Sequence, residues 1–286
     1  MIDMISPLDV VTFGEAMAMF VAKEPGELSE VTEFTRRAAG AELNVAIGLA
    51  RLGVKVGWVS RVGADSFGRF VLNVLAHEKI DHRCVTTDER YPTGFQLKSR
   101  VGGNLDPTVE YFRKNTAASH LAVADFNADY FLSARHLHVT GIAPALSATS
   151  YELALYAMEQ MRAAGKTISF DPNLRPVLWA SREGMVAALN ALAARSDWVL
   201  PGIEEGKVLT GKSTPTEIAD FYLERGAALV VIKLGPGGAI VKDREKKMLA
   251  PARPVAKVVD INYCESASVI KLIYVNQEHG CRKGSS

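Results

Sequence analysis

Short β-branched runs alternate with amphipathic helical segments along most of this 286-residue chain, and this alternation constrains its fold more than any other feature. The run "DVVTFGE" (9–15) ends at Gly14 and is typical of a buried strand. The segment 42–53 has apolar residues at helical spacing and ends at Gly53, a C′ glycine. Because such pairs recur as far as residue 235, the sequence predicts a doubly wound α/β sheet.

The same pattern gives the expected position of each further element. We predict strands at 54–63, 136–142, 166–173, 198–201 and 228–235. We predict helices at 65–80, 150–165, about 182–195, 203–211 and 215–225. Asp65 or Ser66 is placed to cap the first of these helices.

Two segments interrupt the alternation. Residues 93–115 are predicted to form two strands around a Gly-Gly-Asn turn, and residues 16–34 are strand-like with a turn at Pro25-Gly26. Together they predict a small β-sheet, the lid, beside the main domain. Because an unpaired sheet edge is a natural dimer surface, a homo-oligomer through the lid is one expected assembly.

Composition excludes several classes of partner. Lys and Arg number 33 and Asp and Glu 32, so the chain has no overall field that would attract nucleic acid or an anionic membrane. The N-terminus lacks a basic leader region, and apolar runs such as 227–232 are too short to span a bilayer. Three cysteines are typical of a reducing compartment, so we expect a cytoplasmic protein with neither a disulfide framework nor a metal cluster.

Two stretches place polar groups where ligands bind in such sheets. "AAGAELN" (38–44) is a glycine turn that leads into a helix, whose N–H groups and Asn44 can bind ligand oxygens; many ordinary turns share this form. "SFDPNLRP" (169–176) puts Asp171, Asn173 and Arg175 just past a strand end. The alternative interpretation of the second stretch is a capped turn held by an Asp–Arg pair.

Two further stretches carry a charge or a glycine cluster. "EYFRKN" (110–115) puts Tyr111 and Arg113 on one strand face, and Arg113 could converge with Arg175 on an anionic group. Its alternative is a solvated arginine beside an aromatic residue. "VIKLGPGGAI" (231–240) is a strand, a glycine turn and a second strand, where backbone can approach a flat or phosphorylated ligand. No helix follows, so it is not a P-loop.

Six motifs, in order, carry a resemblance: "AGAELNVAIGLARLG", "SRVGADSFG", "YFRKNTAAS", "HLHVTGIAPALS", "DPNLRPVLW" and "VIKLGPGGA". Over residues 9–260 the chain resembles ribokinase-like sugar kinases, and among them the 2-keto-3-deoxygluconate kinases most. The resemblance implies a mostly parallel central sheet flanked by helices, with a β-sheet lid. It also implies phosphoryl transfer from ATP, with Mg²⁺, to the 6-hydroxyl of a sugar acid. The kinase domain would span 1–260, followed by an atypical tail, 261–286.

The resemblance also implies roles for individual residues. The residues implied to contact the sugar are Gly40, Ala41, Glu42, Leu43, Asn44, Gln96, Tyr111, Phe112, Arg113 and Arg175. The residues implied to contact the nucleotide are Asn173, Leu174, Arg175, Lys233, Leu234, Gly235, Pro236, Gly237 and Gly238. In "PGIEEGK" (201–207), Glu205 takes a position that acts on magnesium and phosphates, while Gly202 stands where many members have Asn.

The two arginines favour an acidic substrate. A planar guanidinium binds a carboxylate through two parallel hydrogen bonds, and a neutral ribose or fructose needs no such partner. Arg113 and Arg175 therefore favour a keto acid over the alternative, a fructokinase- or ribokinase-type activity on a neutral sugar.

The segment after Asp260 departs from the family pattern. In the family a Gly-Ala-Gly-Asp motif and a long helix follow, which bind the transferring phosphoryl group and supply the base. Here "INYCESASV" follows, so no catalytic base is identifiable; Glu265 lacks the glycine turn, and Asp65 in "VGADSFG" is expected to be a helix cap. The tail is also shorter than the family's terminal helices. We expect impaired turnover, or a non-catalytic sugar-acid-binding pseudokinase.

Overall fold

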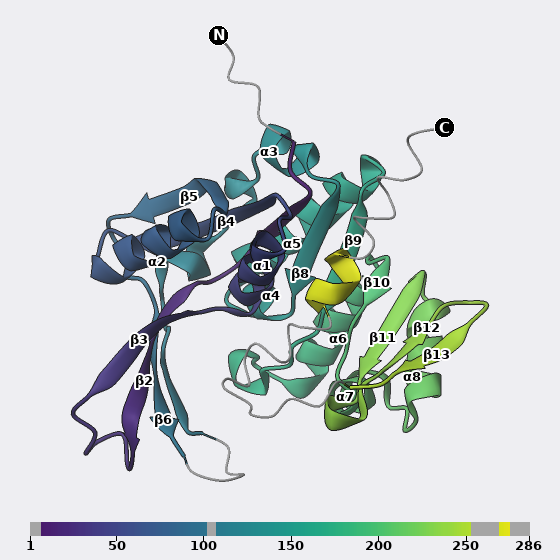
Figure 1. The fold of residues 1–286 in the computed structure, drawn as a ribbon. Helices are drawn as coiled ribbons and strands as arrows, with labels where there is room; N and C mark the ends of the chain where they lie inside the picture. Colours follow the sequence, from purple (N-terminus) through teal and green to yellow (C-terminus); the bar gives the residue numbers. More distant parts are fainter. Residues whose placement is uncertain (1–6, 102–106, 253–268, 275–286) are drawn as a thin grey trace.

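The computed structural model describes residues 7–101, 107–252 and 269–274, and within them the main sheet has nine strands (Figure 1). Their order across the sheet is β13-β12-β11-β10-β9-β8-β1-β4-β5. The strands are β1 (Val10–Phe13), β4 (Val56–Gly63), β5 (Asp81–Asp88), β8 (His136–Thr140), β9 (Thr167–Asp171), β10 (Trp198–Val199), β11 (Leu229–Lys233), β12 (Ala239–Lys242) and β13 (Lys247–Ala250). Pairing is parallel from β5 to β11 and antiparallel at β12 and β13. The predicted α/β fold with a mostly parallel sheet is confirmed.

Helices cover both faces of this sheet. One face carries α1 (Ala41–Arg51) and α2 (Ser66–His77), and the other carries α3 (Ala128–Ser133), α5 (Ala148–Ala163), α6 (Arg182–Ala193), α7 (Ile203–Thr210) and α8 (Pro215–Leu223). A short helix, α4 (Ile142–Ala145), follows β8. The predicted helices from 42 to 225 are confirmed to within a few residues at each end.

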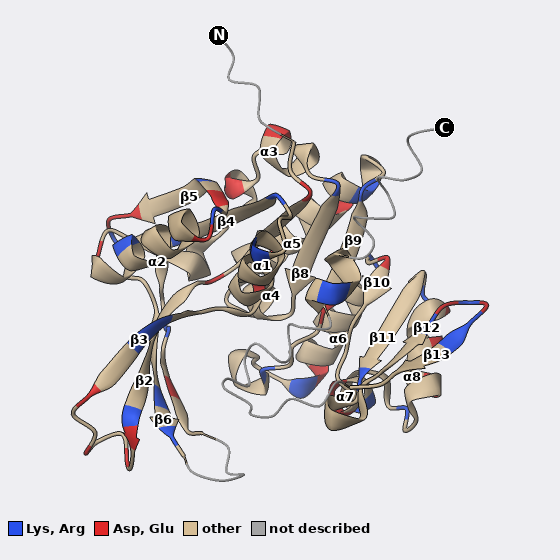
Figure 2. Cartoon of the chain, viewed as in Figure 1, with Lys and Arg blue, Asp and Glu red and all other residues tan. Residues whose placement is uncertain are grey.

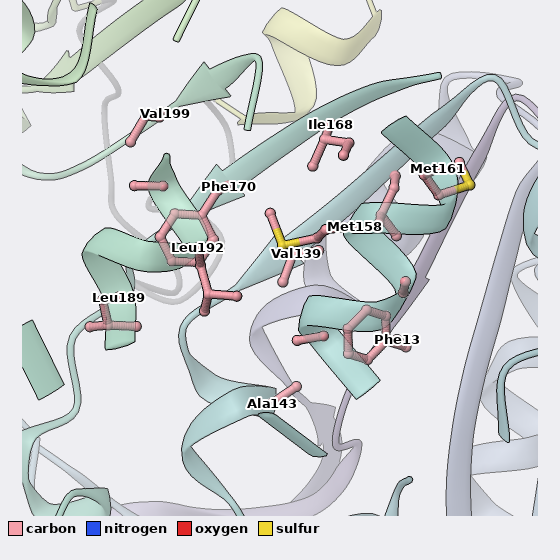
Figure 3. Close-up of a cluster of buried hydrophobic side chains, with 14 of the residues drawn as sticks. Phe13, Val139, Ala143, Met158, Met161, Ile168, Phe170, Leu189, Leu192 and Val199 are labelled. Atoms are coloured by element: carbon pink, nitrogen blue, oxygen red, sulfur yellow. The ribbon is translucent and has the colours of Figure 1, made fainter. Parts of the chain in front are cut away.

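The core has a layer on each side of the sheet. Figure 3 shows the larger cluster, in which Phe13, Val139 and Phe170 of the sheet meet Met158 of α5 and Leu189 of α6. All of these side chains are fully buried, so they account for much of the hydrophobic free energy of folding.

The second core layer includes part of the chain beyond Asp260. Residues 269–274 are helical, and Val269 and Ile273 are buried against the α1 side of the sheet. A Cβ on Gly48 of α1 would lie 2.3 Å from Cδ1 of Ile270, so this segment packs closely on α1. This part of the tail therefore packs as core, whereas the residues directly after Asp260 lie outside the described residues.

The lid is a four-stranded sheet that projects away from the main sheet (Figure 1). Its strands, in spatial order, are β3 (Phe34–Ala39), β2 (Met17–Pro25), β6 (Phe95–Arg100) and β7 (Val109–Phe112). Phe67 of α2 packs on Phe20 and Phe95, with ring centroids 5.5 Å apart in both pairs, and so anchors the lid to the main domain. The predicted Gly-Gly-Asn turn lies outside the described residues.

Charge does not segregate by sign. Figure 2 shows acidic and basic residues interspersed on the lid strands and on the β12–β13 hairpin, and the net charge is +1. Within residues 7–101, 107–252 and 269–274, none of the helices has the length and apolar character needed to cross a membrane.

Asp65 caps α2, as the sequence predicts, and it also holds the lid. Its Oδ1 accepts hydrogen bonds from the backbone N–H groups of Phe67 (2.9 Å) and Gly68 (2.7 Å). Its Oδ2 accepts from the N–H of Thr93 (2.7 Å), two residues before β6. Both oxygens are engaged by backbone, which agrees with a structural role rather than that of a base.

We expect Asp65→Ala to lower the free energy of unfolding by about 1–2 kcal/mol, because it removes a helix cap and orphans Thr93 N–H. Urea denaturation followed by circular dichroism measures the change. Asp65→Asn keeps a cap acceptor but presents an amide to Thr93, so it should lower the free energy of unfolding by less than Asp65→Ala does. Equal stability of Asp65→Ala and the unchanged chain would contradict this role.

Candidate active site

The carboxyl ends of β9 and β11 are joined by a buried ion pair. Asp171 ends β9 and Lys233 ends β11, and Nζ of Lys233 lies 2.9 Å from Oδ1 and 2.7 Å from Oδ2 of Asp171. Both side chains are largely buried, so the contact is stronger than a surface pair. The structure thus brings together two of the stretches in which the sequence places ligand contacts.

Glu205 links the loop after β9 to the loop after β10. Its Oε1 accepts a hydrogen bond from Leu174 N–H (2.7 Å), and its Oε2 accepts from Gly202 N–H (2.6 Å). Beside Leu174, Asn173 has a left-handed backbone (φ 41°), and its buried Oδ1 has no hydrogen-bond partner among the described residues. A buried acceptor without a partner is costly, which makes this oxygen a candidate ligand contact.

The glycine turn after β11 has the predicted form. A short 3₁₀ turn (Gly235–Gly237) leads directly into β12 with no helix between them. Gly238 has φ 91°, and a Cβ there would lie 2.1 Å from the carbonyl oxygen of Ala250. Glycine is therefore required at this position, and the turn brings bare backbone to the strand ends beside Lys233.

A second glycine turn opens α1. Gly40 is the N-cap residue with φ 156°, and a Cβ there would lie 2.5 Å from the carbonyl oxygen of Glu15. Asn44 is buried one turn into the helix. Leu43 is fully buried in the core, so any ligand contact it makes is through its backbone.

Arg113 lies directly after β7 and faces Glu15, which follows β1. Its Nη2 is 2.5 Å from Oε2 of Glu15, and the two side chains are 11% and 1% exposed. Oε1 of Glu15 accepts a hydrogen bond from Thr116 Oγ1 (2.6 Å). Nε of Arg113 is buried and has no hydrogen-bond partner among the described residues, so the groups packed around this guanidinium do not satisfy all of its donors.

A cavity of about 730 Å³ opens beside Arg113. It is bounded by the end of β7, the α4–α5 connection and a 3₁₀ turn (Pro176–Leu178). Its lining residues include Tyr111, Arg113, Lys114, Asn115, Ser119, His120, Ala145, Leu146, Ser147, Ala148, Thr149, Val177 and Leu178. The cavity carries basic and hydroxyl groups, a lining that suits an anionic, oxygen-rich ligand.

Arg175 precedes one part of the cavity wall in sequence. It is the N-cap residue of the 3₁₀ turn whose Val177 and Leu178 line the cavity, and its Nη1 donates to the carbonyl oxygen of Leu174 (2.8 Å). Arg113 lines the cavity, whereas Arg175 is not among the lining residues.

The other predicted sugar contacts occupy different positions. Tyr111 lines the cavity, and Gln96 is buried opposite it in the β6–β7 register. Phe112 stacks on Phe95 with centroids 4.5 Å apart, and Leu234 packs against the larger core cluster. These two side chains stabilise their surroundings, and the structure does not place them in the cavity lining.

Sequence reasoning did not single out Glu15. It lies two residues after the end of β1, and the rule that ligands bind at the carboxyl ends of parallel strands would have included it. Its pairing with Arg113, 98 positions further along the chain, follows only from the fold.

The fold and the site together define a class of protein: a ribokinase-like kinase of small molecules, with strand-end cations and glycine turns beside a β-sheet lid. The chain belongs to the pfkB family of carbohydrate kinases, because the family model described as pfkB family carbohydrate kinase matches residues 7–262.

Individual relatives agree with this family. The chain is 52% identical over 254 residues to the 2-dehydro-3-deoxygluconokinase of Bacillus subtilis (strain 168), which covers 88% of this chain and 78% of the relative. The crystal structure of a PfkB protein from Polaromonas sp. JS666 has 50% identity and a TM-score of 0.89, covering 95% of this chain and 90% of that one. An uncharacterized sugar kinase from Pyrococcus horikoshii in complex with ATP has 27% identity and a TM-score of 0.79, covering 91% and 83%.

Proposed function

We propose that this chain binds 2-keto-3-deoxygluconate, which is the same compound as 2-dehydro-3-deoxygluconate, in the cavity beside Arg113. The observation that carries the proposal is the partly unpaired guanidinium of Arg113 at a cavity of about 730 Å³. A sugar acid brings a carboxylate that the guanidinium of Arg113 can bind where it lines the cavity, while the cavity hydroxyls receive its alcohol groups. The similarity to a 2-dehydro-3-deoxygluconokinase supports the same substrate.

We propose that the reaction is phosphoryl transfer from ATP to the 6-hydroxyl of the sugar acid. ATP would lie at the ends of β9 and β11, where Lys233 supplies a charge and the turn Gly235–Gly238 supplies backbone N–H groups. The ATP complex of the Pyrococcus horikoshii sugar kinase supports this nucleotide. Positioning and electrostatic stabilisation supply most of the catalysis in such reactions.

Mg²⁺ would accompany ATP and neutralise its phosphate charge. The residues present fit this ion, because Mg²⁺ prefers oxygen ligands and keeps several waters rather than a full protein cage. The unpartnered Oδ1 of Asn173 and the carboxylate of Glu205 are the oxygen donors at the strand ends. The described residues hold no cluster of three or more His, Cys, Asp or Glu, so these donors would act on the ion together with the phosphates.

Turnover by this chain is proposed to be low. The sequence after Asp260 lacks the Gly-Ala-Gly-Asp motif that the family uses to bind the phosphoryl group and to accept the hydroxyl proton. Residues 253–268 lie outside the described residues, so the proposal rests on the sequence alone. Asp171 is a poor substitute base, since its carboxylate is engaged by Lys233.

Calorimetry and an ADP-release assay test the proposal together. We expect 2-keto-3-deoxygluconate to bind and D-fructose to bind at least about tenfold more weakly, with little ADP formed from ATP and Mg²⁺. Preference for fructose would favour the neutral-sugar kinase. Binding of the acid with no turnover under any condition would favour the pseudokinase, and binding of neither sugar would refute the proposal.

The lid also supports a proposal about assembly. β7 is an edge strand of the lid, and Tyr111 and Phe112 on it are 46% and 47% exposed. Unpaired strand edges with exposed aromatic residues favour pairing with another chain. We expect light scattering to show dimer formation as concentration rises; a strict monomer at all concentrations would remove this proposal.

A further inference from the structure

Glu42 is a fully buried carboxylic acid in the first turn of α1. Its Oε1 accepts a hydrogen bond from Thr140 Oγ1 (2.5 Å), at the carboxyl end of β8. Its Oε2 has no hydrogen-bond partner among the described residues. Gly14 lies against the carboxyl group, because a Cβ there would be 2.6 Å from Cδ of Glu42. A buried carboxylate with one unsatisfied oxygen is costly in its charged form.

Burial and nearby charged groups together control the ionisation of Glu42. Burial is the main influence and raises the pKa of Glu42 to about 7, while Thr140 and the more distant charge of Arg113 act to lower it. Glu15 follows Gly14 and is paired with Arg113. Glu42 therefore titrates in a range where its charge can respond to a ligand on Arg113.

The remaining nearby titratable groups are fixed in charge or paired. On β8, burial lowers the pKa of His138 to about 3, so this imidazole is neutral. Thr140 is paired in register with Asp171 of β9. The carboxylate of Asp171 is neutralised by Lys233. From α4 a backbone N–H, that of Ala143, reaches Glu42. Arg113 and Glu15 are thus the charged groups whose net effect on Glu42 changes when a ligand carboxylate binds to Arg113.

We propose that Glu42 couples sugar-acid binding to the uptake of up to one proton per site from solvent. The inference rests on the proposed binding of a sugar acid at Arg113. When the ligand carboxylate pairs with Arg113, it neutralises the cation that favours ionised Glu42 and adds a negative charge nearby. The proton goes from solvent to the Glu42 carboxylate, and no other bond changes. Glu42 thereby becomes a determinant of specificity for the acid at mildly acidic to neutral pH.

The sign of the pH dependence follows from linkage. A group whose pKa rises on binding makes affinity highest where the group is already protonated, so affinity falls as pH rises through 7 and above. We expect the Kd of 2-keto-3-deoxygluconate to be about fivefold weaker at about pH 8.5 than at about pH 6.5. At about pH 7.5, binding should take up about half a proton per site.

Calorimetry in phosphate and in Tris measures this uptake directly, because the two buffers release protons with different enthalpies. Glu42→Gln should abolish both the uptake and the pH dependence while retaining the hydrogen bond from Thr140. Circular dichroism of this variant checks that it folds, and the unchanged chain tests the proposal even if it does not. Glu159→Gln, on the exposed surface of α5, is the matched control and should retain the uptake. Glu15→Gln and His120→Asn test the two other groups near Arg113 that could take up a proton.

Each outcome bears on one of the two proposals. Binding without proton uptake in the unchanged chain overturns the role of Glu42 and leaves the proposed function standing. Uptake that persists in Glu42→Gln and disappears in Glu15→Gln or His120→Asn also overturns it, since another group is then the acceptor. Absence of any binding refutes the proposed function and this inference with it.

Discussion

ADP release should rise at least about 100-fold when the tail after Asp260 is replaced by a complete pfkB-family C-terminus. The replacement restores two contributions: a base that accepts the hydroxyl proton, worth about 10²–10⁴-fold, and a phosphoryl-binding turn, whose single donors are worth about 10²–10³-fold. The two factors need not multiply, because groups that act together are not additive. A coupled ADP-release assay with 2-keto-3-deoxygluconate, ATP and Mg²⁺ measures the gain.

The matched control is the same replacement with the motif Asp changed to Asn, which restores the turn and the helix but not the base. It should bind the sugar acid, as the unchanged chain is proposed to do, with little turnover. Equal turnover of the unchanged chain and the full replacement would mean that a base is already present. Glu265, outside the described residues, and Asp171 would then be the first residues to replace.

Arg113→Ala and Arg175→Ala should each weaken binding of 2-keto-3-deoxygluconate by about 1.5–3 kcal/mol, or roughly 10–150-fold. In the proposed binding mode each arginine is a charge-assisted partner of the ligand carboxylate, and each change removes one of them. Affinity for D-fructose should change much less, because a neutral sugar offers no carboxylate. Calorimetry with both sugars separates the two effects, and unchanged affinity for the acid in both variants would contradict a role for these arginines.

Arg113 has a second role that the experiment must separate. Its loss leaves the buried carboxylate of Glu15 without its cation, and breaking a buried pair is strongly destabilising. Arg113→Lys keeps the positive charge but loses the planar donor edge, so it should fold and still bind the acid weakly. Arg83→Ala is the control, since Arg83 forms an ion pair with Asp81 at the surface of β5.

Much of the fold is predictable because strand and helix periods differ so clearly. The helix α2 is an example: Phe70, Val71 and Val74 repeat at helical spacing, and Asp65 marks its start. The edge strand β5 was not predicted, because "DHRCVTTD" (81–88) has neither an apolar run nor a strict alternation. Edge strands face solvent on one side, which removes the sequence signal that buried strands carry.

The candidate site is predictable as far as strand ends identify it. Asp171, Arg175 and Lys233 all follow or end parallel strands, and the sequence singled out each of them. The direct pairing of Asp171 with Lys233 was not predicted, because it depends on the spacing of β9 and β11 across β10. The burial of Glu42 was also not predicted, since a glutamate in a first helical turn is ordinarily a solvated helix-capping charge.

The central position of β1 also determines the order in which this protein can assemble during synthesis. The first strand made stands between β4 and β8, and its pairing with β8 requires residues 136–138. One edge of β1 therefore stays unpaired after β4 has been made, while the ribosome adds the lid strands β6 and β7 and the helix α3. A nascent chain with a β-branched strand edge exposed for that long is open to pairing with other chains. The time taken to synthesise the segment from β5 to α3 thus determines how long this edge of β1 must be protected from pairing with other chains.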